Sequence, residues 1–353
     1  MDFDFDSANA ALNLTGQTLD NGWTVQERHE RPPEDGLLRF SVSYTVTHPS
    51  GRTGFLKVAD FVSVFGQVEL LQAATADYIA ERNIVILCGE KRLSRVVTAI
   101  DHGHFSLPGF LLGDVYYIIF EMASSDVRVA LSQAAEIDLL LKIEMFHHVT
   151  VGLRQLHQHG IAHQDLKPAN LLVFDNEPGR PVGKIADLGR AFREDSPTPH
   201  DLDPVPGDRS FAPPEQLYRY VHPEVDVRRY AADLYQLGSL ACFMFGAVST
   251  NAILAESLSA DHHWNTFGDG YDQALPYLVE AFERALAVLK PQLPPQISTE
   301  IIAMVRYLCH PDAARRGHPR SRSRGGSRFA LERTVAEIDL LARRTAIAIA
   351  RAA

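Results

Sequence analysis

The chain has 353 residues, of which 46% are hydrophobic and 22% are charged, enough for one large or two modest globular lobes. Its formal net charge of −10 at pH 7 argues against general binding to nucleic acid or to an anionic membrane. The three cysteines, Cys88, Cys242 and Cys309, are widely scattered, which argues against a disulfide framework or a zinc site and suits a reducing compartment.

The N-terminal residues 1–20 are polar and acidic, so we expect a loose lead-in before the folded part. They lack the basic-then-apolar order of a secretory signal. The longest apolar stretch, residues 230–248, contains Asp233 and Gln236, which predicts a buried helix rather than a membrane span. We therefore expect a cytoplasmic protein that binds neither membrane nor nucleic acid.

From residue 21 the pattern changes to short runs rich in β-branched and aromatic residues, which predict strands. One helical pattern, around residues 68–82, interrupts them. The predicted strands cover residues 23–26, 40–46, 54–58, 96–101 and 115–121. Five strands and one helix predict a small, sheet-rich lobe.

After about residue 123 the chain becomes mainly helical. Apolar residues recur in steps of three and four from Leu139 to Leu156, which predicts a long amphipathic helix. Residues 171–174 and 183–186 predict a short hairpin. Further helices are predicted at residues 226–247, 275–289, 298–309 and 328–350.

Two stretches gather side chains that suit the handling of a phosphorylated nucleotide: His-Gln-Asp-Leu-Lys-Pro-Ala-Asn and, after it, Lys-Ile-Ala-Asp-Leu-Gly. In the first, Asp165 can accept a proton from an attacking hydroxyl, and Lys167 can neutralise the transferred phosphoryl group. Asn170 and Asp187 offer hard oxygen ligands of the kind that Mg²⁺ prefers. The spacing therefore predicts a site for metal-assisted phosphoryl transfer.

The first stretch resembles the catalytic loop of protein kinases, and the second resembles their metal-binding Asp-Phe-Gly, with Leu188 in place of Phe. The resemblance implies ATP-dependent phosphoryl transfer to Ser or Thr hydroxyls of a protein substrate, with Mg²⁺ or Mn²⁺. It also implies an α+β, two-lobed fold, in which a small five-stranded antiparallel sheet with one helix joins a larger, mainly helical lobe. We expect a kinase domain over residues 21–350, with the small lobe at about 21–121, the hinge at about 121–126 and the large lobe at about 127–350.

A lysine that reaches the nucleotide phosphates is part of this resemblance. Lys57 lies in the apolar run Gly-Phe-Leu-Lys-Val, where a lysine is costly unless it has a partner. We expect the partner to be Glu81, because the apolar residues that follow it match the family's helix. Glu69 is the alternative, only 12 residues from Lys57 instead of 24.

The glycine-rich loop that covers the phosphates departs from the family pattern. Only Gly36 remains, and Leu38 and Ser41 occupy the second and third glycine positions. Phe40 keeps the aromatic place at the tip. Because glycine allows the backbone to approach phosphates closely, we expect weaker nucleotide binding or a stiffer lid.

The nucleotide-base contacts follow from the resemblance alone. Backbone groups of Glu121 and Ala123 would bond the adenine, with Phe120 as the gatekeeper behind it. Leu172 would form the floor of the pocket, and Asp126 would reach the ribose. A plain buried strand would leave the same sequence pattern up to residue 121.

The segment after Asp187 ends in Pro-Pro-Glu, which resembles the family's Ala-Pro-Glu. The resemblance implies that Glu215 pairs with Arg316. It also implies that Asp233, in Asp-Leu-Tyr-Gln-Leu-Gly, holds the backbone of the catalytic loop.

Two departures bear on regulation and specificity. The catalytic-loop arginine that commonly pairs with a phosphorylated activation segment is Gln164 here, so segment phosphorylation loses its usual partner. The threonine that commonly supports substrate docking falls on Asp208. Lys167 suits Ser/Thr kinases better than Tyr kinases.

Three readings remain open from the sequence. The first is a Ser/Thr protein kinase; the second is a weak or inactive pseudokinase that serves as a nucleotide-binding interaction module; the third is a small-molecule phosphotransferase. A basic stretch, residues 315–328, is either a solvated loop or a docking surface for an acidic partner.

Overall fold

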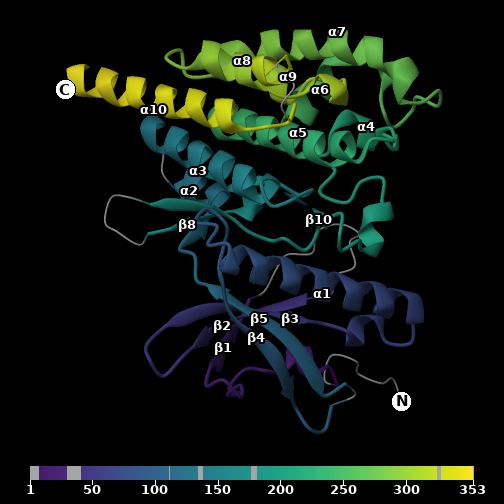
Figure 1. Cartoon of the computed structure of the whole chain (residues 1–353), viewed down its shortest axis with the longest axis vertical. Helices are drawn as coiled ribbons and strands as arrows, with labels where there is room; N and C mark the ends of the chain where they lie inside the picture. The colour runs from purple at the N-terminus through teal and green to yellow at the C-terminus, as the bar shows by residue number, and fades with distance from the viewer. Residues whose placement is uncertain are drawn as a thin grey trace. The chain divides into compact units, whose positions relative to one another are not determined.

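The computed structural model describes residues 8–29, 41–110, 112–133, 138–175, 181–323 and 327–352 (Figure 1). Gly36, Leu38 and Phe40 of the expected phosphate loop lie outside these residues. The chain forms two compact units. The sheet unit comprises Met1–Arg92, Val97–Ala123 and Thr198–His200, and the helical unit comprises Leu93–Val96, Ser124–Pro197 and Asp201–Ala353.

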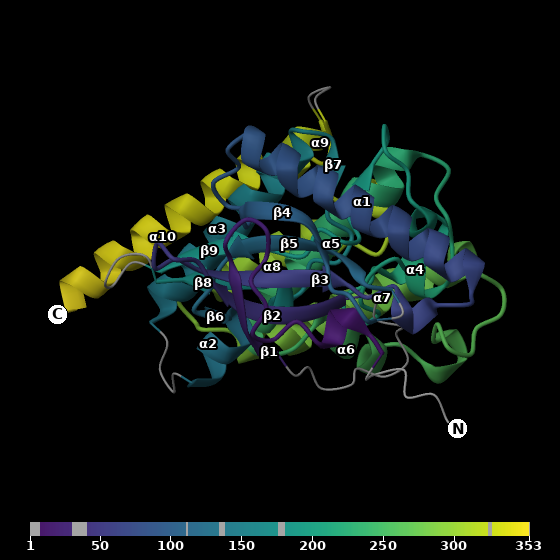
Figure 2. The same ribbon diagram turned by 90° about the horizontal axis from the view of Figure 1, so that it is seen from below.

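The sheet unit is built on one five-stranded antiparallel sheet in the order β1-β2-β3-β5-β4 (Figure 2). The alternating apolar residues of β2 and β3 place Tyr44, Val46, Leu56 and Val58 in its core. The strands are β1 Thr24–Arg28, β2 Ser41–Thr47, β3 Thr53–Ala59, β4 Ala99–Ser106 and β5 Asp114–Glu121. The fold thus has the expected α+β class, with a five-stranded antiparallel sheet and a mainly helical remainder.

One long helix, α1 (Val68–Glu90), packs beside β4 after the short 3-10 turn η2 (Val62–Val64). It continues eight residues past the predicted end because Ile84, Val85 and Cys88 extend its buried face. Glu81 is also buried on this helix, so its carboxylate must find a partner inside the unit.

The expectation of a loose lead-in is wrong for residues 8–20. Ala10 and Leu14 are fully buried and belong to the core of the sheet unit, together with Leu19. The 3-10 turn η1 (Ala10–Leu12) is tied down where the Tyr44 hydroxyl donates to the Ala11 carbonyl at 2.7 Å. With Ala11, four apolar residues of this segment are buried, although its average composition is polar.

The helical unit is organised around α5 (Val225–Gly246), which is buried along most of its length and packs on α3, α6 and α8 (Figure 1). α10 lies along α3 at the C-terminal end. The helices are α2 Val127–Gln133, α3 Leu139–His157, α4 Pro214–Leu217, α6 Thr250–Ser257, α7 Tyr271–Leu289, α8 Ser298–Leu308, α9 Pro319–Arg322 and α10 Glu332–Ala352.

Short strands in the helical unit flank the sequence motifs. They form a three-stranded sheet β6-β8-β9 and a two-stranded sheet β10-β7. The strands are β6 Ser125–Asp126, β7 Ile161–Ala162, β8 Leu171–Phe174, β9 Val182–Ile185 and β10 Phe192–Arg193. The 3-10 turns of the helical unit are η3 Pro168–Asn170, η5 Ala260–His262, η6 Lys290–Gln292 and η7 Ala313–Arg315. The turn η4 Pro199–Leu202 contains residues of both units.

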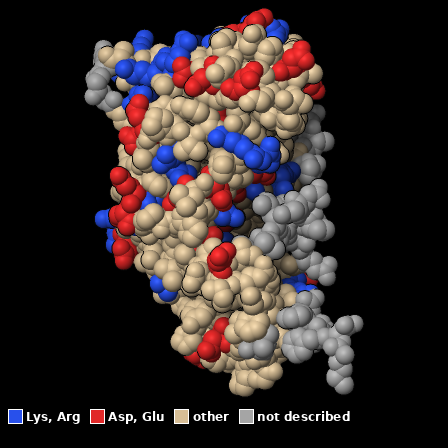
Figure 3. Space-filling model, turned by 90° about the vertical axis from the view of Figure 1, so that its right-hand side faces the viewer, with Lys and Arg blue, Asp and Glu red and all other residues tan. Residues whose placement is uncertain are grey.

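Within the described residues, no single helix is long and apolar enough to cross a membrane. Only α5 and α6 taken together meet the length and composition required, and they meet at a bend of 91°. Acidic and basic side chains lie interspersed on the helical unit's part of the face in Figure 3.

Candidate active site

The loop between β7 and η3 presents Asp165 and Lys167 side by side, with Lys167 Nζ 3.2 Å from Asp165 Oδ2. Asp165 is buried, and this burial raises the pKa of its carboxyl group, although the Lys167 cation opposes the rise. A carboxylate whose charged form is destabilised in this way is a stronger proton acceptor than an exposed one. The pair therefore suits removal of a proton beside a negatively charged group.

The backbone of this loop is held by α5. The Asp233 carboxylate accepts from the backbone N–H groups of His163 at 2.7 Å and Gln164 at 2.8 Å. One turn along the same helix face, Gln236 Oε1 accepts from the Leu166 N–H at 2.8 Å. The contact expected of Asp233 is present, whereas Gln236 was missed; its i+3 spacing from Asp233 was the available signal.

These bonds fix an unusual backbone conformation. Gln164 has a φ of 66°, and Asp187 has a φ of 59°, both in the left-handed region that side-chain-bearing residues seldom occupy. Such conformations persist where the surroundings over-determine them, as the bonds to Gln164 do here. Gln164 directly precedes Asp165, the predicted proton acceptor, and Asp187 is itself a predicted metal ligand.

Asn170 and Asp187 come together through a second set of bonds. Asn170 Nδ2 donates to the Asp165 carbonyl at 2.8 Å and to its Oδ2 at 3.2 Å, which leaves Oδ1 as a ligand atom. The Ala186 N–H donates to the Asn170 carbonyl at 2.9 Å, and His163 Nε2 lies 3.0 Å from the Ala186 carbonyl. The catalytic loop and Asp-Leu-Gly are therefore joined directly.

The donor set fits a hard divalent cation. Asp187 is exposed and presents a carboxylate, and Asn170 presents an amide oxygen, the ligand types that Mg²⁺ and Mn²⁺ take. Asp187 also acts to raise the pKa of the Asp165 carboxyl, after the larger effects of burial and Lys167. Negative charge thus accumulates where a cation would relieve it.

The segment after Asp187 reaches back to this loop at Gly207 and Asp208. The Asp208 N–H donates to Asp165 Oδ1 at 2.7 Å. A Cβ atom on Gly207 would lie 2.4 Å from the Gln164 carbonyl oxygen, so only glycine permits this approach. Gly207 was not singled out from the sequence, where nothing distinguishes it from a turn glycine.

Asp208 also contacts Lys167. Its Oδ2 lies 3.5 Å from Lys167 Nζ. Burial acts to lower the pKa of Lys167, but Asp165 and Asp208 together outweigh it, and the pKa is raised. Lys167 is therefore a firmly charged cation shared between two carboxylates.

The ion pair expected in the sheet unit is present. Lys57 of β3 donates to both carboxylate oxygens of Glu81 on α1, at 2.7 and 2.9 Å. The alternative partner, Glu69, lies exposed in the first turn of the same helix. The bidentate contact holds the Lys57 ammonium group in one place, which suits a lysine that must meet phosphate oxygens.

The proposed adenine contacts lie at the end of β5. The Glu121 N–H already donates to the Thr98 carbonyl at 3.1 Å, and its side chain accepts from the Thr98 N–H at 2.7 Å. Phe120 and Ala123 are partly buried at the same strand end. Gly36, assigned to the phosphates, lies outside the described residues.

In the helical unit, Leu172 lies on β8 opposite Asp126 of β6. The Asp126 carboxylate accepts from the backbone N–H groups of Arg128 at 2.7 Å and Val129 at 3.1 Å. Asp126 therefore caps the start of α2 and pairs with the Arg128 side chain at 2.9 Å. Its expected contact with a ribose would compete with these bonds.

The expected pair between Glu215 and Arg316 is present deep in the helical unit, with two bonds of 2.6 and 2.7 Å. Arg316 is fully buried and its guanidinium lies 4.9 Å from the Tyr235 ring centroid. Arg328, at the other end of the basic stretch, pairs with Glu224. These two arginines are thus engaged within the fold instead of forming a free basic surface.

Comparison with known proteins agrees with this geometry. Residues 68–321, more than half of the chain, match the family model described as protein kinase domain. The serine/threonine-protein kinase ksp1 of Schizosaccharomyces pombe is 35% identical over 131 residues, which cover 36% of this chain and 24% of that protein. The serine/threonine-protein kinase ssp1 of the same yeast is 28% identical over 149 residues, 41% of this chain and 22% of that protein.

A bacterial protein is also similar, over about the same length of this chain. A probable serine/threonine-protein kinase of Clostridium acetobutylicum is 26% identical over 129 residues, which cover 36% of this chain and 19% of that protein. The chain therefore spans less than a quarter of the length of each of these three relatives.

Proposed function

Because the chain belongs to the protein kinase family, we propose that it transfers the γ-phosphoryl group of ATP to Ser or Thr hydroxyls of a protein substrate. The observation that carries this proposal is the joined cluster of Asp165, Lys167 and Asn170, linked through Ala186 to Asp187. The names of the three similar proteins, all serine/threonine-protein kinases, support the choice of acceptor.

Each residue of the cluster has one task in this reaction. Asp165 orients the acceptor hydroxyl and accepts its proton, for which its burial prepares it. Lys167 faces the negative charge of the phosphoryl group in flight. Asn170 and Asp187 would hold Mg²⁺ or Mn²⁺, which supplies charge neutralisation at the phosphates. Lys57, held by Glu81, positions the nucleotide.

A small-molecule phosphotransferase is less well supported. The Glu215–Arg316 pair and the Asp233 bonds to the catalytic loop are features that the family uses in lobes that hold peptide substrates. A weak or inactive kinase has one specific observation in its favour, because Asp208 Oδ2 lies 3.5 Å from Lys167 Nζ and partly neutralises its charge.

The proposal is tested by incubating the purified protein with labelled ATP, Mg²⁺ or Mn²⁺ and a general protein acceptor. Asp165→Asn should abolish transfer and leave nucleotide binding intact, whereas Asp187→Asn should also weaken metal-dependent nucleotide binding. Phosphoserine and phosphothreonine should be the products. Nucleotide binding by the wild-type protein without transfer to any acceptor would favour the pseudokinase instead.

A further inference from the structure

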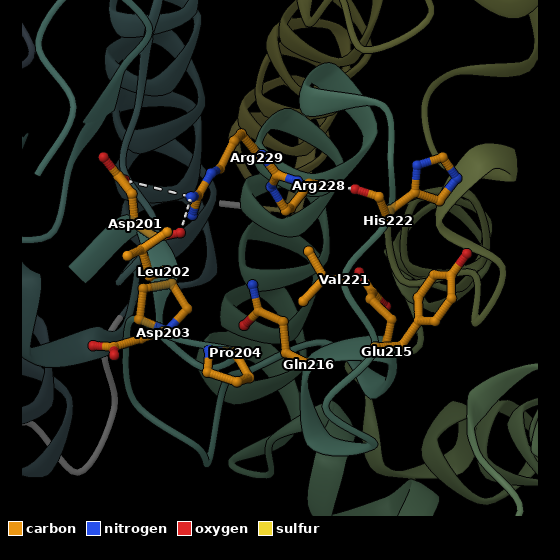
Figure 4. A pocket seen from close by; sticks show the side chains of 12 residues that line it. Asp201, Leu202, Asp203, Pro204, Glu215, Gln216, Val221, His222, Arg228 and Arg229 are labelled. Atoms are coloured by element: carbon orange, nitrogen blue, oxygen red, sulfur yellow. Dashed lines mark hydrogen bonds and ion pairs between the residues drawn. The ribbon is translucent and has the colours of Figure 1, made fainter. Parts of the chain in front are cut away.

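The first turns of α5 carry a buried arginine that touches three separate parts of the helical unit. Arg229 is 2% exposed. Its Nη1 donates to Gln164 Oε1 at 3.2 Å. Its Nη2 donates to the Asp201 carbonyl at 2.7 Å (Figure 4). The guanidinium lies 4.6 Å from the centroid of the Phe192 ring on β10. One side chain thus joins the catalytic loop to two places in the activation segment (residues 187–215): Phe192 on β10 and Asp201.

The opposite charges of Arg229 and Asp201 also favour this contact. Arg229 Nη2 lies 3.4 Å from the Asp201 carboxylate, whose side chain is also mostly buried. Removing one member of a buried ion pair leaves the other charge without compensation, so such a pair strongly favours the conformation that contains it. The pair therefore fixes Asp201 at the start of the helix α5.

Gln164 completes the arrangement from the catalytic loop. Its Nε2 donates to the Arg229 carbonyl at 2.9 Å while its Oε1 accepts from the guanidinium. An amide can both donate and accept, whereas an arginine at this position could only donate. Gln164 therefore suits a site that already contains a cation.

The packing beside Asp201 is open. A cavity of about 140 Å³ lies between the segment and α5, bordered by Asp201, Pro204, Gln216 and Arg229 (Figure 4). Leu202, next in the chain, is 86% exposed. Apolar burial therefore contributes little at Asp201 and Leu202, where the polar contacts of Arg229 hold the segment. Further along, the Asp208 N–H bond to Asp165 holds it as well.

From these contacts we propose that Arg229 is a positioning residue that clamps the activation segment to the catalytic loop without any phosphate, through Asp201 on one side and Gln164 on the other. The Asp201 carboxylate supplies the anion that a phosphorylated residue would supply, and the cation comes from α5 instead of the catalytic loop. The role of this clamp in turnover rests on the proposed kinase activity.

The test compares Arg229→Gln, Asp201→Asn and the double variant with wild type, all as phosphatase-treated full-length protein. We expect each single variant to lower kcat, by roughly ten- to a hundredfold for Arg229→Gln, because small displacements of catalytic groups have effects of this size. The KM for ATP should stay within about twofold, since no nucleotide-binding group is touched. The double variant should lose no more than Arg229→Gln alone, as expected of residues that act as one pair.

Hydrogen exchange provides a readout that does not need activity. Backbone amides of residues 191–210 should lose protection in Arg229→Gln and in Asp201→Asn, while those of α7 and α8 should not. Arg228→Gln is the matched control: Arg228 is the adjacent arginine of α5, and its Nη1 donates to the His222 carbonyl at 3.1 Å. It should leave both the kcat and the protection of residues 191–210 near wild type.

Three results would overturn the clamp: unchanged protection in Arg229→Gln, additive losses in the double variant, or equal effects of Arg228→Gln. If Arg229→Gln fails to fold, Asp201→Asn carries the test, because it keeps the carbonyl acceptor and every donor. A wild-type protein that transfers no phosphate but shows the expected exchange pattern would refute the proposed function and leave the clamp standing.

Discussion

At the scale of single residues, Asp165 is subject to two opposing demands. The proposed reaction needs its charged form to accept a proton, yet burial raises its pKa above the ordinary value, so folding favours the protonated form. For a carboxyl group whose pKa is raised on folding, the contribution to stability is present at low pH and is lost as the pH rises through the folded-state pKa. At neutral pH the ionised group therefore destabilises the fold.

Asp165→Asn should accordingly remove phosphoryl transfer without lowering the melting temperature, and should raise it if the carboxylate is ionised in the wild type. The amide oxygen can still accept from the Asp208 N–H. Thermal unfolding followed at pH 7, beside a transfer assay, checks both parts. A clear fall in melting temperature would contradict the assignment of Asp165 as a functional rather than a stabilising charge.

The same raised pKa predicts the pH dependence of catalysis. Since proton acceptance needs the ionised carboxylate, kcat/KM should fall as the pH drops through the pKa of Asp165. The acid limb should lie above the unperturbed aspartate value of about 3.9. Initial rates measured across the range in which wild-type circular dichroism stays constant would locate the limb, and a limb at or below that value would contradict the expectation.

Asp208 should restrain catalysis through its contact with Lys167. Asp208→Thr should raise the transfer rate by roughly two- to fivefold, the range expected from freeing one partly screened ion pair. Ser210→Thr, a conservative change at an exposed position two residues along, serves as the control. A loss of activity in Asp208→Thr would mean that the carboxylate itself serves the reaction.

At the scale of elements, the ion pair between Lys57 of β3 and Glu81 of α1 holds the Lys57 ammonium group in one place. Lys57→Met should lower kcat by roughly a hundredfold or more, in line with the loss of one preorganised electrostatic contact. Glu81→Gln should give a milder defect of the same kind, because the amide still offers an oxygen to Lys57. Glu69→Gln, an exposed change on the same helix, should have almost no effect; the reverse order of the two glutamate variants would show that the wrong partner was chosen.

Elements with a strong period were predictable from the sequence, and short ones were not. The strands β1, β2, β3 and β5 and the helices α3, α5, α7 and α8 agree with the predictions to within a few residues, whereas β4 ends five residues beyond the predicted end at residue 101. By contrast α4 and α9, each four residues long, cannot show a helical repeat. The burial of residues 8–20 was not predicted, because it depends on Tyr44 and on a sheet whose strands follow later in the sequence.

The residues of the candidate site also fall into two groups: those that a sequence motif contains and those that only the structure brings to attention. Asp165, Lys167, Asn170 and Asp187 stand in two short motifs with a fixed spacing, so they could be predicted from the sequence alone. Gly207 lies against Gln164, and Arg229 contacts Gln164 and Asp201, which are 65 and 28 positions away; no local pattern contains such contacts. They could be found only once the structure brought the activation segment, α5 and the catalytic loop together.

At the scale of the whole molecule, the positions of the basic side chains around the activation segment decide whether a phosphate on that segment would find a cationic partner. The activation segment between Asp187 and Glu215 has arginines of its own, and Arg193 pairs with Asp195. Thr198, one of the hydroxyls available for phosphorylation, is buried, and its Oγ1 lies within 3.0 Å of His200. His200 in turn lies 3.0 Å from Asp77, so a phosphate on Thr198 would enter a site that already holds a carboxylate.

Activity should therefore not require phosphorylation of the activation segment. A phosphate carries about −1.5 to −2 charges and needs a cationic partner to order a loop, and Gln164 offers only amide donors. Phosphatase treatment followed by assay of an exogenous acceptor should leave the rate unchanged, with mass spectrometry to verify dephosphorylation. A large fall in rate that returns on rephosphorylation at Ser196, Thr198 or Ser210 would show that local arginines such as Arg190 or Arg209 take the phosphate. Unchanged activity would place control in substrate supply or in a partner protein, because the segment would then already be in its active conformation.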